Sequence, residues 1–154
     1  MLTEKDYCDY ETCVALKELG YKVPTSAYYM PKNSQLIFVI NQFRGGAAMD
    51  CFYSNNSLPK ECMGSDFIDA PTMWEAQKWL REEKGMLVDS MVFADNSIDA
   101  DGKVVDRWIY YSCAILNTST AEFIRSYDQS DEYDTYEEAL LEGIKEAVKI
   151  LKEK

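Results

Sequence analysis

The sequence predicts an α+β protein in which an antiparallel β-meander is flanked by helices. Two helical segments, residues 72–84 and 135–151, begin with the same Thr-x-x-Glu pattern, which is typical of a capped helix N-terminus. Between them lie three segments rich in β-branched and aromatic residues. The connections between these segments are too short for crossovers, so the strands pair antiparallel. The expected order over residues 72–151 is α-β-β-β-α, preceded by an N-terminal helix and a β-hairpin extension.

The N-terminal helix is expected over residues 9–19. Asp9 is a favourable N-cap residue, and Gly20 stands where helices commonly end. Apolar side chains recur between them at helical spacing, at Cys13, Leu16 and Leu19.

A β-hairpin is expected after this helix. Residues 27–30 and 35–41 form its strands, around the turn-forming residues 31–34. Residues 47–53 predict a further strand, and residues 54–69 are typical of a loop.

The second helix, residues 72–84, carries two tryptophans. Thr72 and Glu75 form its capping box. Trp74 and Trp79 lie five residues apart, so their side chains point about 140° apart around the helix axis. They cannot both face one core, and one of them is expected to be partly exposed.

The three strands of the meander are expected at residues 87–94, 104–116 and 121–127. Residues 95–103 are predicted as a long polar turn, and residues 117–120 as a tight one. The middle strand is apolar on both faces, whereas a strand with one solvated face alternates apolar and polar residues. We therefore expect it to be central and covered on both sides. The helices would cover one side, and the N-terminal half or a second copy of the chain would cover the other.

The last helix is expected over residues 135–151. Thr135 and Glu138 repeat the capping box. Gly143 falls in the middle of the helix, where glycine costs about 1 kcal/mol relative to alanine. A glycine there predicts that the helix packs closely on the sheet.

The composition is that of a folded and strongly acidic protein. The chain has 154 residues, 47% of them apolar, with 27 acidic and 16 basic residues and a net charge of −11. This charge repels phosphate groups, so nucleic acid and anionic membranes are not expected as partners. The sequence has no histidine, which excludes imidazole-based catalysis and metal binding. No change of composition marks a linker, so we expect a single domain over residues 1–154, with residues 1–70 as a candidate N-terminal subdomain.

Three features predict a cytoplasmic protein. The five cysteines include no Cys-x-x-Cys pair and are odd in number, so they are expected to be reduced thiols. The first residues carry acidic side chains and no apolar region, so no signal peptide is expected. The longest apolar run, residues 36–40, is far shorter than the ~20 residues that span a membrane.

No pattern of residues predicts a catalytic, cofactor-binding or metal site. Residues 99–102 are similar to part of a calcium loop, but Trp108 stands where a bidentate glutamate is required. The acidic residues between 128 and 134 favour a helix N-terminus, with a cation site or a nucleic-acid mimic as alternatives. Aromatic residues that could form an interaction surface are Trp74, Trp108 and Tyr110.

Three stretches resemble a known family. Residues 70–82 (APTMWEAQKWLRE), residues 133–147 (beginning YDTYEEAL) and residues 9–21 resemble short proteins of unassigned activity from gut anaerobic bacteria and their prophages and mobile elements. The start of the last helix also resembles that of HicB-type antitoxins, in which a meander precedes a helix. Neither resemblance implies a catalytic residue or a cofactor.

Several classes of function are consistent with these observations. The leading hypothesis is a non-catalytic protein-interaction module of a phage or mobile element, which acts on a protein partner or by self-association as a homodimer. The alternatives are an enzyme that depends on carboxylates or on a metal held by oxygen ligands, and an acidic mimic of nucleic acid or antitoxin-like protein. No cofactor is expected.

Overall fold

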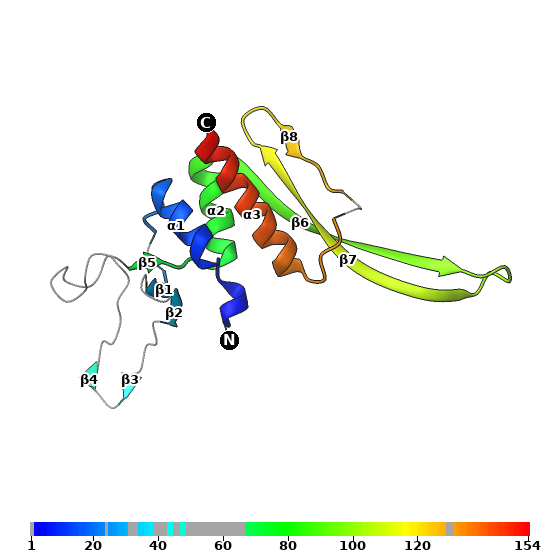
Figure 1. Ribbon diagram of the computed structural model, residues 1–154, viewed down its shortest axis with the longest axis horizontal. Helices are drawn as coiled ribbons and strands as arrows, with labels where there is room; N and C mark the ends of the chain where they lie inside the picture. The colour runs from blue at the N-terminus through cyan, green and yellow to red at the C-terminus, as the bar shows by residue number, and fades with distance from the viewer. Residues whose placement is uncertain are drawn as a thin grey trace. The chain divides into compact units, whose positions relative to one another are not determined.

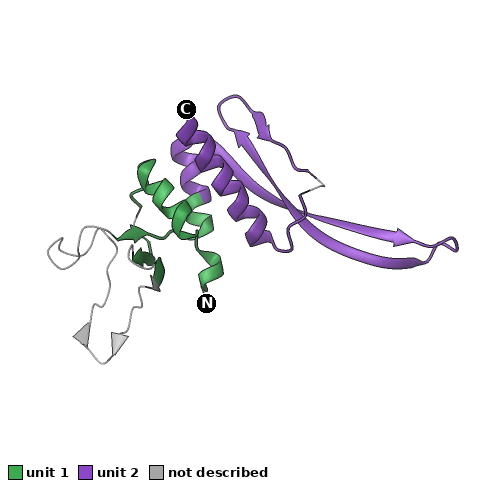
Figure 2. Cartoon of the chain, in the orientation of Figure 1, with its two compact units in different colours: residues 1–76 green, residues 77–154 purple. Residues whose placement is uncertain are grey.

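The chain folds as an α+β protein, as the sequence predicts. The structure is a computed structural model that describes residues 2–23, 25–30, 34–38, 43–44, 47–48, 67–128 and 131–154. The chain divides into two compact units, residues 1–76 and 77–154, with the boundary inside the second helix (Figure 2). None of the described helices is long and apolar enough to cross a membrane.

The first unit contains a helix and a small antiparallel sheet. It opens with a 3-10 turn, η1 (Glu4–Asp6), and α1 (Tyr10–Glu18). In the sheet, β1 (Ala27–Met30) lies between β2 (Gln35–Phe38) and β5 (Ile68–Asp69). A separate two-stranded ladder pairs β3 (Phe43–Arg44) with β4 (Ala47–Ala48).

The prediction that residues 54–69 form only a loop is wrong at its end, where Ile68 and Asp69 are β5 and pair with β1. The reason is that Ile68 is buried, and its backbone occupies the second edge of β1. The predicted turn at 31–33, and the parts of the predicted strands and loop at 39–41 and 49–66, lie outside the described residues.

The second unit is the predicted helix-flanked meander. It continues from α2 (Met73–Lys84) into β6 (Met86–Ile98), β7 (Val104–Asn117), β8 (Glu122–Arg125) and α3 (Tyr136–Glu153). The three strands form one antiparallel sheet in the order β6-β7-β8, with α3 lying along one face (Figure 1).

Each of the three described α-helices has the N-cap residue that the sequence predicts. The Asp9 carboxylate accepts a hydrogen bond from the Thr12 backbone N–H, at 2.9 Å, and starts α1. In α2 the capping box is complete, because the Thr72 N–H donates to Glu75 Oε2 at 2.7 Å and the Glu75 N–H donates to Thr72 Oγ1 at 3.3 Å. Thr135 caps α3, its Oγ1 accepting from the Glu138 N–H at 3.1 Å.

The close approach predicted from Gly143 is confirmed. A Cβ atom added to this residue would lie 2.6 Å from Val88 Cγ1 on β6 and 3.2 Å from Cys113 Cβ on β7. Both distances are shorter than ordinary van der Waals contact, so only glycine lets α3 sit this close to the sheet. Val88, Cys113 and Ile115 are fully buried in this contact region.

One prediction about the meander is wrong. The long polar turn at 95–103 is shorter, because β6 runs to Ile98 and stays paired with β7 despite its polar sequence. The middle strand is central, as predicted, and both of its faces are buried near its C-terminal end, at Cys113 and Ala114. Further toward its N-terminus the chain leaves it open, since Ile109 is 64% exposed. Cover of this part by a second copy of the chain stays a prediction.

Candidate interaction surface

The hairpin of β6 and β7 runs on well past the rest of its unit. The last point of support for β7 is Tyr111, which exchanges two backbone hydrogen bonds with Tyr133 and packs edge-on against Tyr136 of α3. We call residues 92–111 the arm. Strands rise about 3.4 Å a residue, so the arm reaches on the order of 20 Å past its first pair, Val92 and Tyr111. Figure 1 shows this ribbon beyond α3 and β8.

The arm has two faces, which the strand register defines. Residues directly opposite in an antiparallel pair point to the same face, and neighbours along a strand point to opposite faces. The rest of the hairpin, residues 86–91 and 112–117, is the base. The face of the base that α3 covers, through Val88 and Cys113, is the inner face. Its continuation along the arm holds Val92, Ala94, Asn96, Arg107, Ile109 and Tyr111. The outer face of the two strands holds Leu87, Asp89, Met91, Phe93, Asp95, Ser97, Asp106, Trp108, Tyr110, Ser112, Ala114 and Leu116.

Large apolar side chains are exposed on both faces of the arm. On the inner face, Val92 is 53% exposed and Ile109 is 64% exposed. On the outer face, Trp108 is 41% exposed, and Met91 beside the arm is equally open. Isolated exposed apolar residues are common on protein surfaces, but a contiguous group of them marks an interaction site.

The outer face is organised by aromatic rings. Phe93 and Tyr110 stack with their ring centroids 5.4 Å apart and an angle of 11° between the planes. Tyr127, which follows β8, packs against Phe93 at 6.4 Å, and its hydroxyl donates to Asp89 Oδ2 at 3.0 Å. Burial, together with this hydrogen bond and the negative charge of Asp89, raises the pKa of Tyr127 to about 12. These contacts hold the rings in place and leave a structured apolar surface.

A hollow of about 140 Å³ opens on the outer face at the base of the arm. Its lining is mainly apolar and comes from all three strands and from Tyr127. Phe123, on β8, is 58% exposed at this hollow. The lining residues are Leu87, Asp89, Ala114, Leu116, Phe123 and Tyr127. A hollow of this size and composition suits a single apolar side chain from a partner.

The three residues that the sequence indicates as an interaction surface lie in different settings. Trp108 and Tyr110 share the outer face of β7. Trp108 is exposed, whereas Tyr110 is only 9% exposed because Phe93 covers its ring. Trp74 is 41% exposed on the first turn of α2, in the first unit, and Trp79 is buried. The split between the two tryptophans agrees with the angular argument.

Sequence reasoning did not single out Met91, Val92, Phe123 or Tyr127. Val92 lies in a predicted strand, and nothing in its neighbours indicates that α3 ends before reaching it. A usable signal for Tyr127 was its place as an aromatic residue at the end of the strand predicted over residues 121–127.

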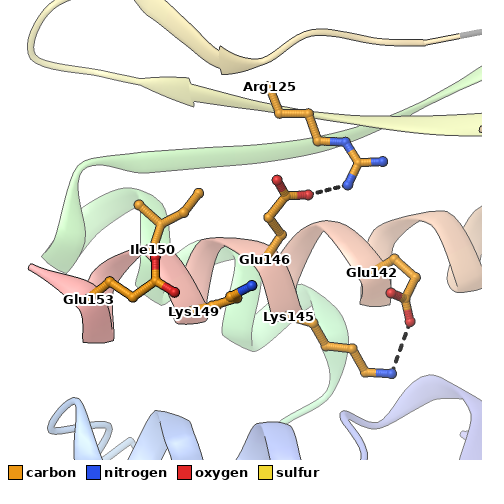
Figure 3. Close-up of a pocket in the computed structure, with 7 residues that line it drawn as sticks. All are labelled: Arg125, Glu142, Lys145, Glu146, Lys149, Ile150 and Glu153. Carbon is orange, nitrogen blue, oxygen red and sulfur yellow. Dashed lines mark hydrogen bonds and ion pairs between the residues drawn. The ribbon is translucent and has the colours of Figure 1, made fainter.

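A second hollow, of about 440 Å³, lies between β8 and α3 and is lined mostly by charged side chains (Figure 3). Three cations and three carboxylates balance one another in it. They are Arg125, Lys145 and Lys149, and Glu142, Glu146 and Glu153. The Arg125 guanidinium is already paired with Glu146 of α3 and with Asp131, and Lys145 Nζ lies 3.0 Å from Glu142 Oε1.

Arg125 therefore ties β8 to α3 and to the segment between them. Burial of its side chain favours the neutral form, but the hydrogen bonds to Asp131 and Glu146 outweigh this effect and raise the pKa of Arg125. Asp131 belongs to the acidic segment that the sequence offered as a cation site, and it is engaged here in an ion pair. The charged residues at this hollow thus hold β8, α3 and the segment between them together.

The described cysteines are buried thiols. Cys8, Cys13 and Cys113 are buried and are not joined in disulfides, and burial is the largest cause of the raised pKa values of Cys13 and Cys113. A raised pKa keeps a thiol protonated and unreactive. Cys51 and Cys62 lie outside the described residues. Within the described ranges, no group of three or more Cys, Asp or Glu side chains is arranged to hold a metal ion.

Comparison of the chain with protein-family models, curated proteins and solved structures gives no match.

Proposed function

We propose that this protein is a non-catalytic interaction module that binds another protein through its arm. The observation that carries the proposal is the exposure of large apolar side chains on both faces of the arm, residues 92–111. The resemblance of residues 70–82 and 133–147 supports a role in a phage or mobile element. The three described cysteines form no disulfide, which supports a cytoplasmic location.

The energetics of the arm favour binding. A two-stranded ribbon is marginally stable in water, because it has no second layer to bury its apolar side chains. Burial of apolar surface is worth roughly 25 cal/mol per Å². Trp108, Val92 and Ile109 stay exposed after folding, so a partner that covers them gains this free energy on binding. An exposed apolar strand edge also promotes unwanted association, and a partner that covers it removes this hazard.

The charge of the arm limits which partners fit. The chain has a net charge of −11, and Asp95, Asp99, Asp101 and Asp106 outnumber Lys103 and Arg107 on the arm. Such a surface repels phosphate groups, which supports a protein partner over a nucleic acid or an anionic membrane.

A shortened arm tests the proposal. Residues 95–108 are replaced by Asn-Gly, which joins the opposed residues Ala94 and Ile109 by a two-residue turn. The full-length and shortened chains are each used for affinity purification from the native host, and light scattering measures self-association. We expect the shortened chain to keep its circular dichroism spectrum and to lose the specific partner, whether that is a host protein or a second copy. A folded, shortened chain that retains every partner would refute the proposal.

A second variant keeps the test valid if the shortened chain does not fold. Val92 and Ile109 are exposed, so replacing both by serine should change stability little. Together with Trp108→Ser, these changes remove apolar surface from both faces of the arm. The triple variant should fold and should also lose the partner.

A further inference from the structure

We propose that the outer face of the β6–β7 hairpin binds a basic amphipathic helix of another protein. Such a helix carries a stripe of apolar residues flanked by lysine or arginine. This inference rests on the proposed function and deepens it, because it assigns one face of the hairpin and one class of partner.

The charges on the outer face are all of one sign. Asp89, Asp95 and Asp106 are its charged residues on β6 and β7, and neither strand places a lysine or arginine there. The inner face differs, since its charged residue on the arm is Arg107. Each of these carboxylates accepts a hydrogen bond from the backbone N–H of the next residue, but neither strand places a cation beside it on this face. A partner that covers the outer face must therefore supply positive charge beside its apolar groups, because covering a charge that no cation neutralises is costly.

The position of Trp108 reinforces this requirement. Asp95 on β6 is directly opposite Trp108 on β7, so a carboxylate and an exposed indole share one pair of the outer face. A lysine or arginine side chain placed there interacts with the carboxylate by charge and with the ring by a cation–π contact. Asp89, at the hollow, provides a second carboxylate beside aromatic rings.

The shape of the outer face suits a helix. The inner face at the base is already covered by α3, and domains of this type bury sheet faces under helices. From the hollow to Trp108 the outer face offers an apolar track of Leu116, Phe123, Met91, Phe93 and Trp108. The hollow of about 140 Å³ takes one apolar anchor residue at the start of this track.

A second copy of the chain is a poor occupant for this face. Two outer faces brought together would place Asp89, Asp95 and Asp106 of one copy against the same carboxylates of the other. Like charges opposed across an interface are destabilising. The charge pattern thus favours a different, basic partner.

The test uses three labelled peptides, each about 18 residues long, so that a helix spans about 27 Å. The first has an apolar leucine stripe flanked by lysines, the second has glutamate in place of each lysine, and the third has the lysine composition scrambled to remove the stripe. Binding to the full chain is measured by fluorescence anisotropy. We expect the first peptide to bind at least about tenfold more tightly than either of the others.

Neighbouring substitutions on β7 assign the face. Trp108→Ala, on the outer face, should weaken binding of the first peptide by about tenfold or more, whereas Ile109→Ala, on the inner face, should change it by less than about twofold. Asp95→Asn combined with Asp106→Asn should weaken binding by about fivefold. Glu83→Gln combined with Glu122→Gln changes the net charge equally at exposed sites and should have little effect, which controls for general attraction to an acidic chain.

Each outcome bears on one claim. Equal effects of Trp108→Ala and Ile109→Ala, equal effects of the two double variants, or equal binding of the scrambled or glutamate peptide would overturn the inference. Loss of the native partner on shortening the arm, combined with such a result, would leave the proposed function intact and reject only the basic helix. Retention of the native partner by the folded, shortened chain would reject the proposed function itself.

Discussion

The base and the arm of the β6–β7 hairpin are two regions of the same strands that differ in burial. Ile115 and Ile109 are both isoleucines on the inner face of β7, yet Ile115 is fully buried and Ile109 is 64% exposed. The difference arises from α3, whose 18 residues span about 27 Å and whose first turn reaches Tyr111. An apolar residue in a strand is therefore suited to burial, but whether it is buried depends on how far the covering helix extends.

The largest contrast is expected for alanine in place of these two isoleucines. Ile115→Ala removes packed atoms from the base and should lower the free energy of unfolding by about 2–5 kcal/mol. Ile109→Ala should change it by less than about 0.5 kcal/mol, because its side chain has little to lose. Urea unfolding followed by circular dichroism measures both. Similar losses for both variants would show that the arm is packed in the free protein.

Gly143→Ala tests the packing of α3 on the base, the contact that distinguishes the base from the arm. The added methyl group would meet Val88 Cγ1 at 2.6 Å, so strain of about 1–3 kcal/mol should exceed the gain of about 1 kcal/mol in helix propensity. Unfolding free energies should therefore fall. Combining Gly143→Ala with Val88→Ala should recover part of the loss relative to the sum of the single variants, because the two side chains share the same space. Strict additivity would argue against this contact.

The first turn of α3 determines where the covered base ends and the arm begins, so loosening this turn should expose more of the hairpin. Thr135→Ala removes the side-chain acceptor for the Glu138 N–H and should cost about 1 kcal/mol. The first turn of α3 should fray, and Tyr136 should then protect Tyr111 less. Amide exchange should rise at the start of α3 and at Tyr111 and stay unchanged at Ile115. A uniform rise across the unit would indicate a global loss of stability instead.

An effect that depends on pH is expected at the outer face, through Tyr127. Its pKa is raised from about 10 when unfolded to about 12 when folded, so the folded state holds this proton more tightly. This contribution to stability is present below pH 10 and is lost as the pH rises from 10 to 12. Tyr127→Phe should therefore reduce the loss of unfolding free energy over that interval. An unchanged pH profile would mean that neither burial nor the bond to Asp89 raises the pKa of this hydroxyl in solution.

The helices and the order of the meander could be predicted because their signals are local. The capping pairs Thr72–Glu75 and Thr135–Glu138 lie within one helical turn. Gly143 in the middle of a helix by itself indicates a close approach to a neighbouring element. The extension of β6 to Ile98 could not be predicted, because Asp95, Asn96 and Ser97 favour turns and are held in the strand only by pairing with β7.

The candidate site was predictable only in part. The two apolar faces of β7 indicated that it needs cover on both sides, and Trp108, which the sequence indicates as part of an interaction surface, is 41% exposed. The sequence could not show that this cover is missing over the arm, because that depends on where α3 ends in space. The hollow depends on residues from three strands, and only the register brings Leu87, Leu116 and Phe123 together.

Amide hydrogen exchange along β6 and β7 in the free protein tests the central claim most directly. If the base is core and the arm is an uncovered binding surface, amides at Val88, Cys113 and Ile115 should exchange only through global unfolding. Amides of the arm around Ala94 and Ile109 should exchange faster by about a hundredfold or more. Equal protection of base and arm would contradict the account, because it would mean that the arm is already covered in the free protein.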